Sequence, residues 1–209
     1  LISTTQFNMQ EKFWGYRYVM KSFQDIYKFG SSADLGISAA YKFCDWLSAD
    51  AIVVNGEGYK KIQKNDGLMY GLGATLTPVK ALTFRAYYGL NEGSDAKQEN
   101  IQNLATFVGL KLNGFSLGAE YNRIWNMKHV DDSDMNGFSI YSNIKLNKGA
   151  DLYLRFDDYN GDETGFIAGV QWKLGKYVKV SPNFRWNHAD VDGGNQDSYM
   201  GYISCYFGF

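Results

Sequence analysis

The sequence predicts an all-β protein whose antiparallel strands form an up-and-down barrel across a membrane. Three observations favour this fold class: alternating strands follow one another from residue 33 onward, short and long connections alternate between them, and the last strand is rich in aromatic residues. Strands of about ten residues with lipid-facing and lumen-facing positions in alternation are the pattern of a membrane barrel. We therefore predict a single domain over residues 1–209.

The composition agrees with this fold class. Tyr (16), Phe (14) and Gly (23) are abundant, whereas Pro occurs only twice, which favours long paired strands and aromatic girdles at membrane interfaces. The mean hydropathy is −0.35, and no run of about 18 apolar residues exists that could form a membrane-spanning helix. The net charge of −1 gives no support to nucleic-acid binding, so no nucleic-acid partner is expected.

Eleven strands are predicted over residues 33–209. In the first, at 33–43, apolar residues such as Leu35 and Ile37 alternate with polar and small ones. Pro78 is expected to end the third strand, because proline cannot donate a hydrogen bond to a neighbouring strand. The other ten strands are expected at 47–55, 68–76, 82–90, 101–112, 115–125, 138–146, 150–156, 166–174, 178–186 and 199–209.

The predicted connections are of two kinds. Tight hairpin turns are expected at 44–46, 78–80, 113–114, 147–149 and 175–177. Longer polar connections are expected at 57–66, 91–100, 126–136, 160–164 and 187–197. This alternation is typical of membrane barrels, which carry short turns on one side and longer loops on the other. A soluble all-β fold is the alternative, and such folds seldom show this asymmetry.

The stretch 6–32 departs from the strand pattern and predicts an amphipathic helix. Asn8 and Glu11 have the spacing of a capping box, with Asn8 as the N-cap. Gly15 is a point where the helix can be interrupted, and Gly30 can end it. The apolar residues that recur at three- and four-residue spacing are Met9, Phe13, Tyr16, Met20, Phe23 and Tyr27.

Three stretches carry a resemblance to a known family. They resemble porin-like outer-membrane proteins of the Bacteroidota, which are loosely grouped with phosphate-selective porins. The stretches are QEKFWGYRY at 10–18, KFGSSADLG at 28–36 and VNGEGY at 54–59. The resemblance covers essentially the whole chain. The last strand also resembles the C-terminal signature of outer-membrane barrels, which implies recognition by the barrel-assembly machinery through Tyr199, Ile203, Phe207 and Phe209.

The resemblance implies a passive diffusion channel for small hydrophilic solutes or ions in the bacterial outer membrane. It implies a homotrimer in contact with outer-membrane lipid and lipopolysaccharide, without catalytic residues, metal or cofactor. Bacterial barrels have even strand numbers, so eleven strands lead us to expect the C-terminal portion of a longer, sixteen-stranded barrel. In porins of that size the loop after the fifth strand folds into the barrel, and the stretch 6–32 falls at that place.

With the apolar set facing lipid, the alternate residues of each strand face the lumen. The candidate pore-lining residues are Lys42, Arg85, Glu120, Arg155, Asp157 and Arg185, with Lys145, Lys173 and Lys179 near the short turns. The arginines are interpreted either as a constriction or mildly anion-selective ladder, or as part of a mixed-charge wall that pairs its own charges. The candidate constriction-loop residues are Lys12, Arg17, Lys21 and Lys28; the alternative for this loop is a surface cap or a contact to a neighbouring subunit.

Two other classes of function stay open at this stage. One is a structural or scaffold barrel, plugged, that anchors a surface complex or binds a partner protein. The other is a barrel hydrolase, for which His129 beside Asp131 and His188 beside Asp190 offer suitable residue types. Acidic loop tips are mostly solvated surface, so no enzymatic activity is expected.

Overall fold

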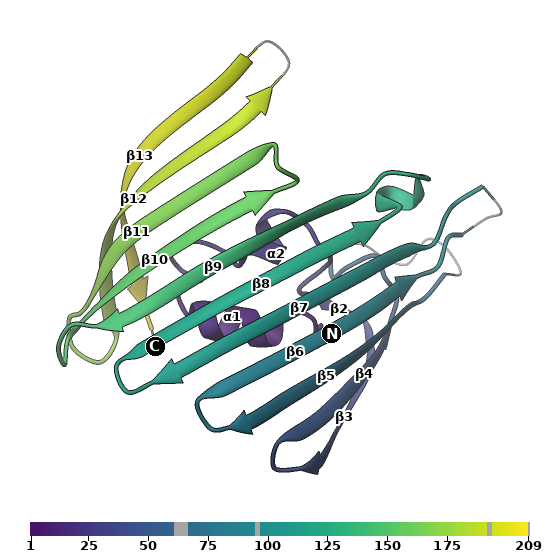
Figure 1. The fold of residues 1–209 in the computed structure, drawn as a ribbon, viewed down its shortest axis with the longest axis horizontal. Helices are drawn as coiled ribbons and strands as arrows, with labels where there is room; N and C mark the ends of the chain where they lie inside the picture. Colours follow the sequence, from purple (N-terminus) through teal and green to yellow (C-terminus); the bar gives the residue numbers. More distant parts are fainter. Residues whose placement is uncertain (61–66, 95–96, 192–193, 209) are drawn as a thin grey trace.

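The computed structural model describes residues 1–60, 67–94, 97–191 and 194–208. Its main feature is one curved antiparallel sheet of eleven strands, each paired with the next in chain order (Figure 1). The strands are β3 (Gly36–Cys44), β4 (Leu47–Val54), β5 (Met69–Val79), β6 (Leu82–Asn91), β7 (Ile101–Leu112), β8 (Phe115–Trp125), β9 (Met135–Lys145), β10 (Ala150–Tyr159), β11 (Glu163–Lys173), β12 (Val178–Val191) and β13 (Gly194–Phe207). The sheet has β3 and β13 at its edges. The predicted all-β antiparallel fold and its eleven strands are confirmed.

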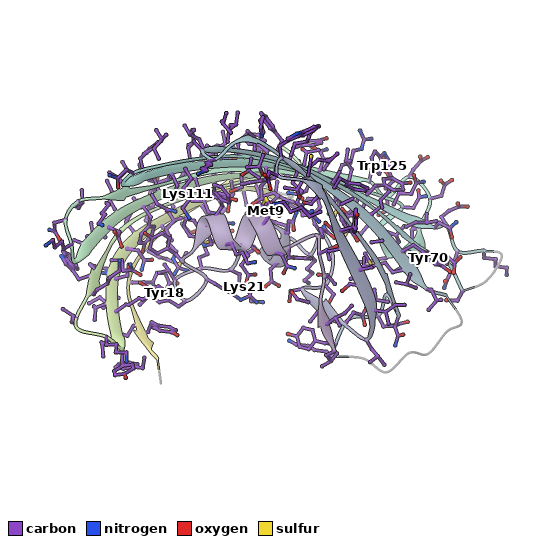
Figure 2. All side chains as sticks on the ribbon, turned by 90° about the horizontal axis from the view of Figure 1, so that it is seen from below. Met9, Tyr18, Lys21, Tyr70, Lys111 and Trp125 are labelled. Carbon is purple, nitrogen blue, oxygen red and sulfur yellow. The ribbon has the colours of Figure 1, made fainter. Side chains whose placement is uncertain are left out.

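The two faces of the sheet differ in the way the alternation predicts. The convex face carries large apolar side chains with nothing packed on them: Ile37, Leu72 and Ile203 expose 74, 63 and 74 % of their surface. The concave face is polar and aromatic, and its central side chains, such as Asn122 and Tyr153, are fully buried. Figure 2 shows what buries them, because the N-terminal helices lie beneath the arch of the sheet.

Residues 4–32, which we call the inward segment, lie on the concave face and contain α1 (Asn8–Trp14) and α2 (Phe23–Ile26). The two ends of the inward segment lie side by side. β1 (Ile2–Ser3) pairs with β2 (Ala33–Asp34) in a separate two-stranded sheet, and the Thr4 N–H donates a hydrogen bond to the Ser32 carbonyl at 3.1 Å. No helix within the described ranges is long and apolar enough to cross a membrane.

The helical stretch is shorter and more broken than the periodicity predicts. α1 stops at Gly15, whose left-handed backbone (φ +73°) lets its N–H donate to the Glu11 carbonyl at 3.0 Å. The predicted capping box is wrong: Phe7 occupies the N-cap, and Asn8 lies inside the helix. The Asn8 carboxamide oxygen is already occupied, because it accepts a hydrogen bond from the Ser3 hydroxyl at 2.8 Å.

Two connections that were predicted to be long loops are short. β10 and β11 are joined by residues 160–162, where Asn160 (φ 57°) and Gly161 (φ 74°) adopt the left-handed geometry of a tight hairpin. β12 and β13 stay paired as far as Val191 and Gly194, so most of the second predicted loop is strand. The predicted alternation of short and long connections is therefore wrong at these two positions.

Pro78 does not end its strand. β5 continues to Val79, and its pairing with β6 shifts register between Leu76 and Val79. This irregularity contains Pro78, where the missing N–H removes no regular hydrogen bond of the sheet.

The first predicted strand is split at Leu35 into β2 and β3. The carboxylate of Asp34, which is 2 % exposed, accepts a hydrogen bond from the Leu35 N–H at 2.7 Å. Its other oxygen accepts from the N–H groups of Gly56 (2.9 Å) and Gly58 (3.1 Å). These three bonds hold the chain at the point where it leaves the inward segment and enters β3.

Candidate functional site

An aromatic cluster fixes the inward segment to the centre of the concave face. The indole of Trp14 is 1 % exposed and packs edge-on against Tyr141 and Tyr153, at centroid distances of 5.9 and 5.7 Å. Tyr16 lies against the Tyr153 ring at 4.2 Å. The indole N–H of Trp14 donates to the Met20 carbonyl at 2.8 Å and folds the chain back after α1. Such rings dominate the energetics of a contact, so this cluster is the main anchor of the segment.

Arg155 connects the wall to the segment beneath this cluster. Its guanidinium binds both carboxylate oxygens of Asp157 at 2.7 Å and lies 5.1 Å from the Trp14 ring. A further N–H donates to the backbone carbonyl of Lys21 at 2.6 Å. Arg155 and Asp157 are 2 and 3 % exposed, so both sequence-predicted residues are covered by the segment.

Arg85 repeats this arrangement near the start of the segment. Its guanidinium holds both oxygens of Asp50, at 2.6 and 2.9 Å, and donates to the backbone carbonyl of Thr5 at 3.0 Å. Arg85 is 6 % exposed. The positive charge of Arg85 is therefore paired with a carboxylate and directed at the segment.

Arg185 makes the third contact of this kind. It donates to the backbone carbonyl of Val19 at 2.7 Å and to the Asn183 carboxamide oxygen at 2.9 Å, and it lies 4.2 Å from the Tyr202 ring. In contrast to Arg85 and Arg155, its charge has no carboxylate partner among the described residues. The three arginines proposed as a ladder thus share one role in the geometry, which is to hold backbone carbonyls of the inward segment.

Buried amides complete the contact between wall and segment. Glu120, 4 % exposed, accepts a hydrogen bond from Asn122 at 3.0 Å, and Asn122 accepts one from Gln24 of α2 at 2.6 Å. Asn103 of the wall donates to the carbonyl of Phe29. Buried polar groups need such partners, and the bonds of Gln24 to Asn122 and of Asn103 to Phe29 supply them across the contact.

The four predicted constriction-loop cations lie on the exposed side of the segment. Lys12, Arg17, Lys21 and Lys28 are all exposed, and Lys21 points away from the sheet in Figure 2. Arg17 contacts Glu11 (2.6 Å) and Asp25 (2.8 Å), while Lys21 contacts Asp25 (3.4 Å). Within the described ranges Lys12 and Lys28 have no ion-pair partner, so this surface carries both signs with an excess of positive charge.

Tyr18 adds a polar but uncharged group to the segment. Its hydroxyl donates to the Gln171 carboxamide oxygen of β11 at 2.9 Å. Burial raises the pKa of Tyr18 to about 12, so its phenol is neutral at physiological pH.

The other predicted site residues lie away from this contact. Lys42 is exposed at the turn end of β3, 2.6 Å from Asp45. Tyr199, Ile203 and Phe207 form an exposed apolar row on the convex face of β13; Phe209 lies outside the described residues.

The two histidines of the hydrolase alternative lie far from one another in the chain and make different contacts. His188 pairs with Asp197 at 2.9 Å, and His129 contacts the Glu99 carbonyl at 2.8 Å. In the described part of the chain, no group of three or more His, Cys, Asp or Glu could hold a metal ion.

Neither the central place of Trp14 nor the contacts to backbone carbonyls is predicted by the periodicity of the sequence. Trp14 falls between Phe13 and Tyr16 of the helical periodicity, so the pattern did not place it on the apolar face. The aromatic run around Gly15 was a usable signal, because four aromatic residues within six positions exceed what one helix face can present.

Comparison with known proteins gives the fold a name. No protein-family model matches the sequence, and no curated protein matches it. Among solved structures, OmpT of Vibrio cholerae matches 99 % of this chain and 74 % of its own length, with a TM-score of 0.68 and 15 % identity. OmpF of Salmonella typhi matches 80 % of this chain with a TM-score of 0.62 and 13 % identity. A further porin matches 85 % of this chain with a TM-score of 0.59 and 14 % identity. The fold is a porin fold.

This likeness concerns the porin fold alone, because all three identities are low. The chain spans 63 % of the length of that further porin and 60 % of OmpF, which is less than two thirds of each.

Proposed function

We propose that this chain forms the wall and the constriction of an outer-membrane porin, through which small hydrophilic solutes or ions diffuse passively. The observation that carries the proposal is the inward segment, held on the concave face of a porin-like sheet by buried contacts and presenting charged side chains away from that sheet. A channel of this kind selects by size and charge, and needs no catalytic residue.

The proposed selectivity is a mild preference for anions. Lys12 and Lys28 support it, because they lie exposed on the inward segment without an ion-pair partner among the described residues. Lys42 and Arg185 are proposed to contribute from the wall. Arg85 and Arg155, with Glu120 and Asp157, are proposed to act indirectly, by fixing the segment that narrows the channel.

Location and assembly follow from the same proposal. The exposed apolar convex face suits contact with outer-membrane lipid and lipopolysaccharide. We propose that the C-terminal strand, with Tyr199, Ile203, Phe207 and Phe209, is read by the barrel-assembly machinery, and that the protein is a homotrimer. The stretches at 10–18 and 28–36 support placing it with the porin-like proteins of the Bacteroidota.

Planar-bilayer recordings of the full-length protein test the function. We expect discrete conductance steps with a linear current–voltage relation, and a reversal potential in a KCl gradient that indicates a preference for chloride. The tight packing of the inward segment favours one competitor, a plugged scaffold barrel, which predicts no steps. A reversal potential of the opposite sign would contradict the anion preference while leaving the channel in place.

A further inference from the structure

A cavity of about 440 Å³ lies between the Gly15 end of α1 and the short-turn ends of β7 to β12. Five lysines line it: Lys12 of the inward segment and Lys111, Lys145, Lys173 and Lys179 of the wall. Asp151 is the one acidic residue among the described residues that line the cavity. The sequence predicts Lys145, Lys173 and Lys179 near the short turns and Lys12 on the constriction loop, but it singles out neither Lys111 nor a shared cavity.

The positive charge of this lysine cavity is largely unpaired. Lys173 contacts Asp151 at 3.1 Å, and the Lys179 ammonium lies 5.2 Å from the Tyr206 ring. Lys12, Lys111 and Lys145 have no carboxylate within ion-pairing distance in the described part of the chain. The deeper wall behaves differently, because Arg85 and Arg155 each hold a carboxylate of their own. Among the described residues that line the cavity, five lysines and one carboxylate leave an excess of four positive charges, which attracts anions from solution.

We propose that the lysine cavity is a binding site for small multivalent anions, such as di- and tricarboxylates. Its volume is within the range of small-molecule sites, of about 300–1,000 Å³. Ammonium groups on flexible stems can turn several charge-assisted donors toward one ligand, and this favours an anion with several charged oxygens over chloride. Anionic lipid is an unsuitable occupant, because the cavity opens on the concave face, whereas lipid contacts the convex face.

The position of the cavity has a consequence for transport. It lies at the short-turn end of the wall beside α1, so an occupant there stands next to the inward segment on one side of it only. We expect a multivalent anion to reduce the current more strongly when it is added from the short-turn side. This effect rests on the proposed channel function, whereas binding of the anion does not.

Calorimetric titration of the full-length protein with citrate, in detergent at low ionic strength, tests the site. We expect saturable binding that Lys111→Gln/Lys145→Gln weakens about tenfold, because two unpaired charges are lost. The matched control is Lys148→Gln/Lys176→Gln, which removes two lysines from short turns at the same end that do not line the cavity. Equal weakening in both double variants, or no weakening in the first, overturns the proposal.

Bilayer recordings with citrate on one side at a time separate this proposal from the proposed function. Both proposals are supported if citrate blocks the current from one side, if Lys111→Gln/Lys145→Gln loses this block, and if Lys148→Gln/Lys176→Gln keeps it. Citrate binding without any conductance step refutes the porin and supports the site. Conductance steps with no specific loss of citrate binding in Lys111→Gln/Lys145→Gln refute the site and support the porin.

Discussion

Excision of residues 6–30, with Thr5 joined to Ser31 through two glycines, raises the single-channel conductance several-fold and leaves the eleven-stranded sheet intact. The sheet survives because the ends of the inward segment already meet: the Thr4 N–H and hydroxyl donate to the carbonyls of Ser32 and Ser31, at 3.1 and 2.5 Å. The conductance rises because the segment no longer occupies the concave space, and water hydrates the wall groups that it covered.

Conductance steps and the reversal potential are recorded for the excised protein and for Lys28→Gln. This control keeps the segment and removes one exposed charge, so the step size should stay near that of the wild type while the reversal potential shifts. Folding of the excised protein is checked by its resistance to protease in detergent. A folded protein with an unchanged step would show that the segment does not narrow the channel.

Arg155→Ala destabilises the protein and enlarges its conductance. The change leaves the Asp157 carboxylate buried without its partner, and breaking a buried ion pair in this way costs about 3–5 kcal/mol. It also removes the donor to the Lys21 carbonyl and the cation that lies against the Trp14 ring. Urea unfolding measures the first effect, and the mean and noise of the open-channel current measure the release of the segment.

Arg123→Ala is the matched control, because Arg123 pairs with Asp134 at 3.1 Å on the surface, where the two side chains are 40 and 36 % exposed. Exposed pairs contribute about 0.2–1 kcal/mol, so this variant should unfold close to wild type. Arg155→Met/Asp157→Leu removes both charges of this pair, so neither is left buried without its partner, and stability should recover while the larger conductance persists. Equal losses in Arg155→Ala and Arg123→Ala would contradict the role given to the buried pair.

The strands could be predicted from the sequence because their two faces meet different surroundings: the convex face is apolar and exposed, whereas the concave face packs polar and aromatic side chains against the inward segment. That difference imposes a period of two, as in β5, where exposed Leu72 and Leu76 alternate with buried Gly71 and Gly73. In the outer part of β13, residues 194–197 are all exposed and none is apolar, so the alternation disappears. This is why the outer parts of β12 and β13 were assigned to a loop.

The face of the sheet on which each wall residue lies was predictable from the sequence, but the contacts of these residues were not. Alternation predicts that Arg85, Arg155 and Arg185 lie on the face opposite the apolar side chains, and all three lie on the concave face, where they contact the inward segment. Their partners are carbonyls of the inward segment, separated from Arg155 by 134 residues in the case of Lys21. Periodicity predicts the face on which a side chain lies. It does not predict which groups of a segment distant in sequence will contact that side chain.

The hydrogen bonds from Arg85, Arg155 and Arg185 to backbone carbonyls have a consequence for which residues of the inward segment can be substituted. A peptide carbonyl is the same in every amino acid, so the contacts at Thr5, Val19 and Lys21 do not depend on which side chains those positions carry. The exposed side chains of the inward segment can therefore be substituted one by one without loss of the hydrogen bonds that hold its backbone on the wall. In the proposed channel, substitutions on the exposed side of the segment therefore change the permeability, while the contacts between the wall and the segment backbone stay the same.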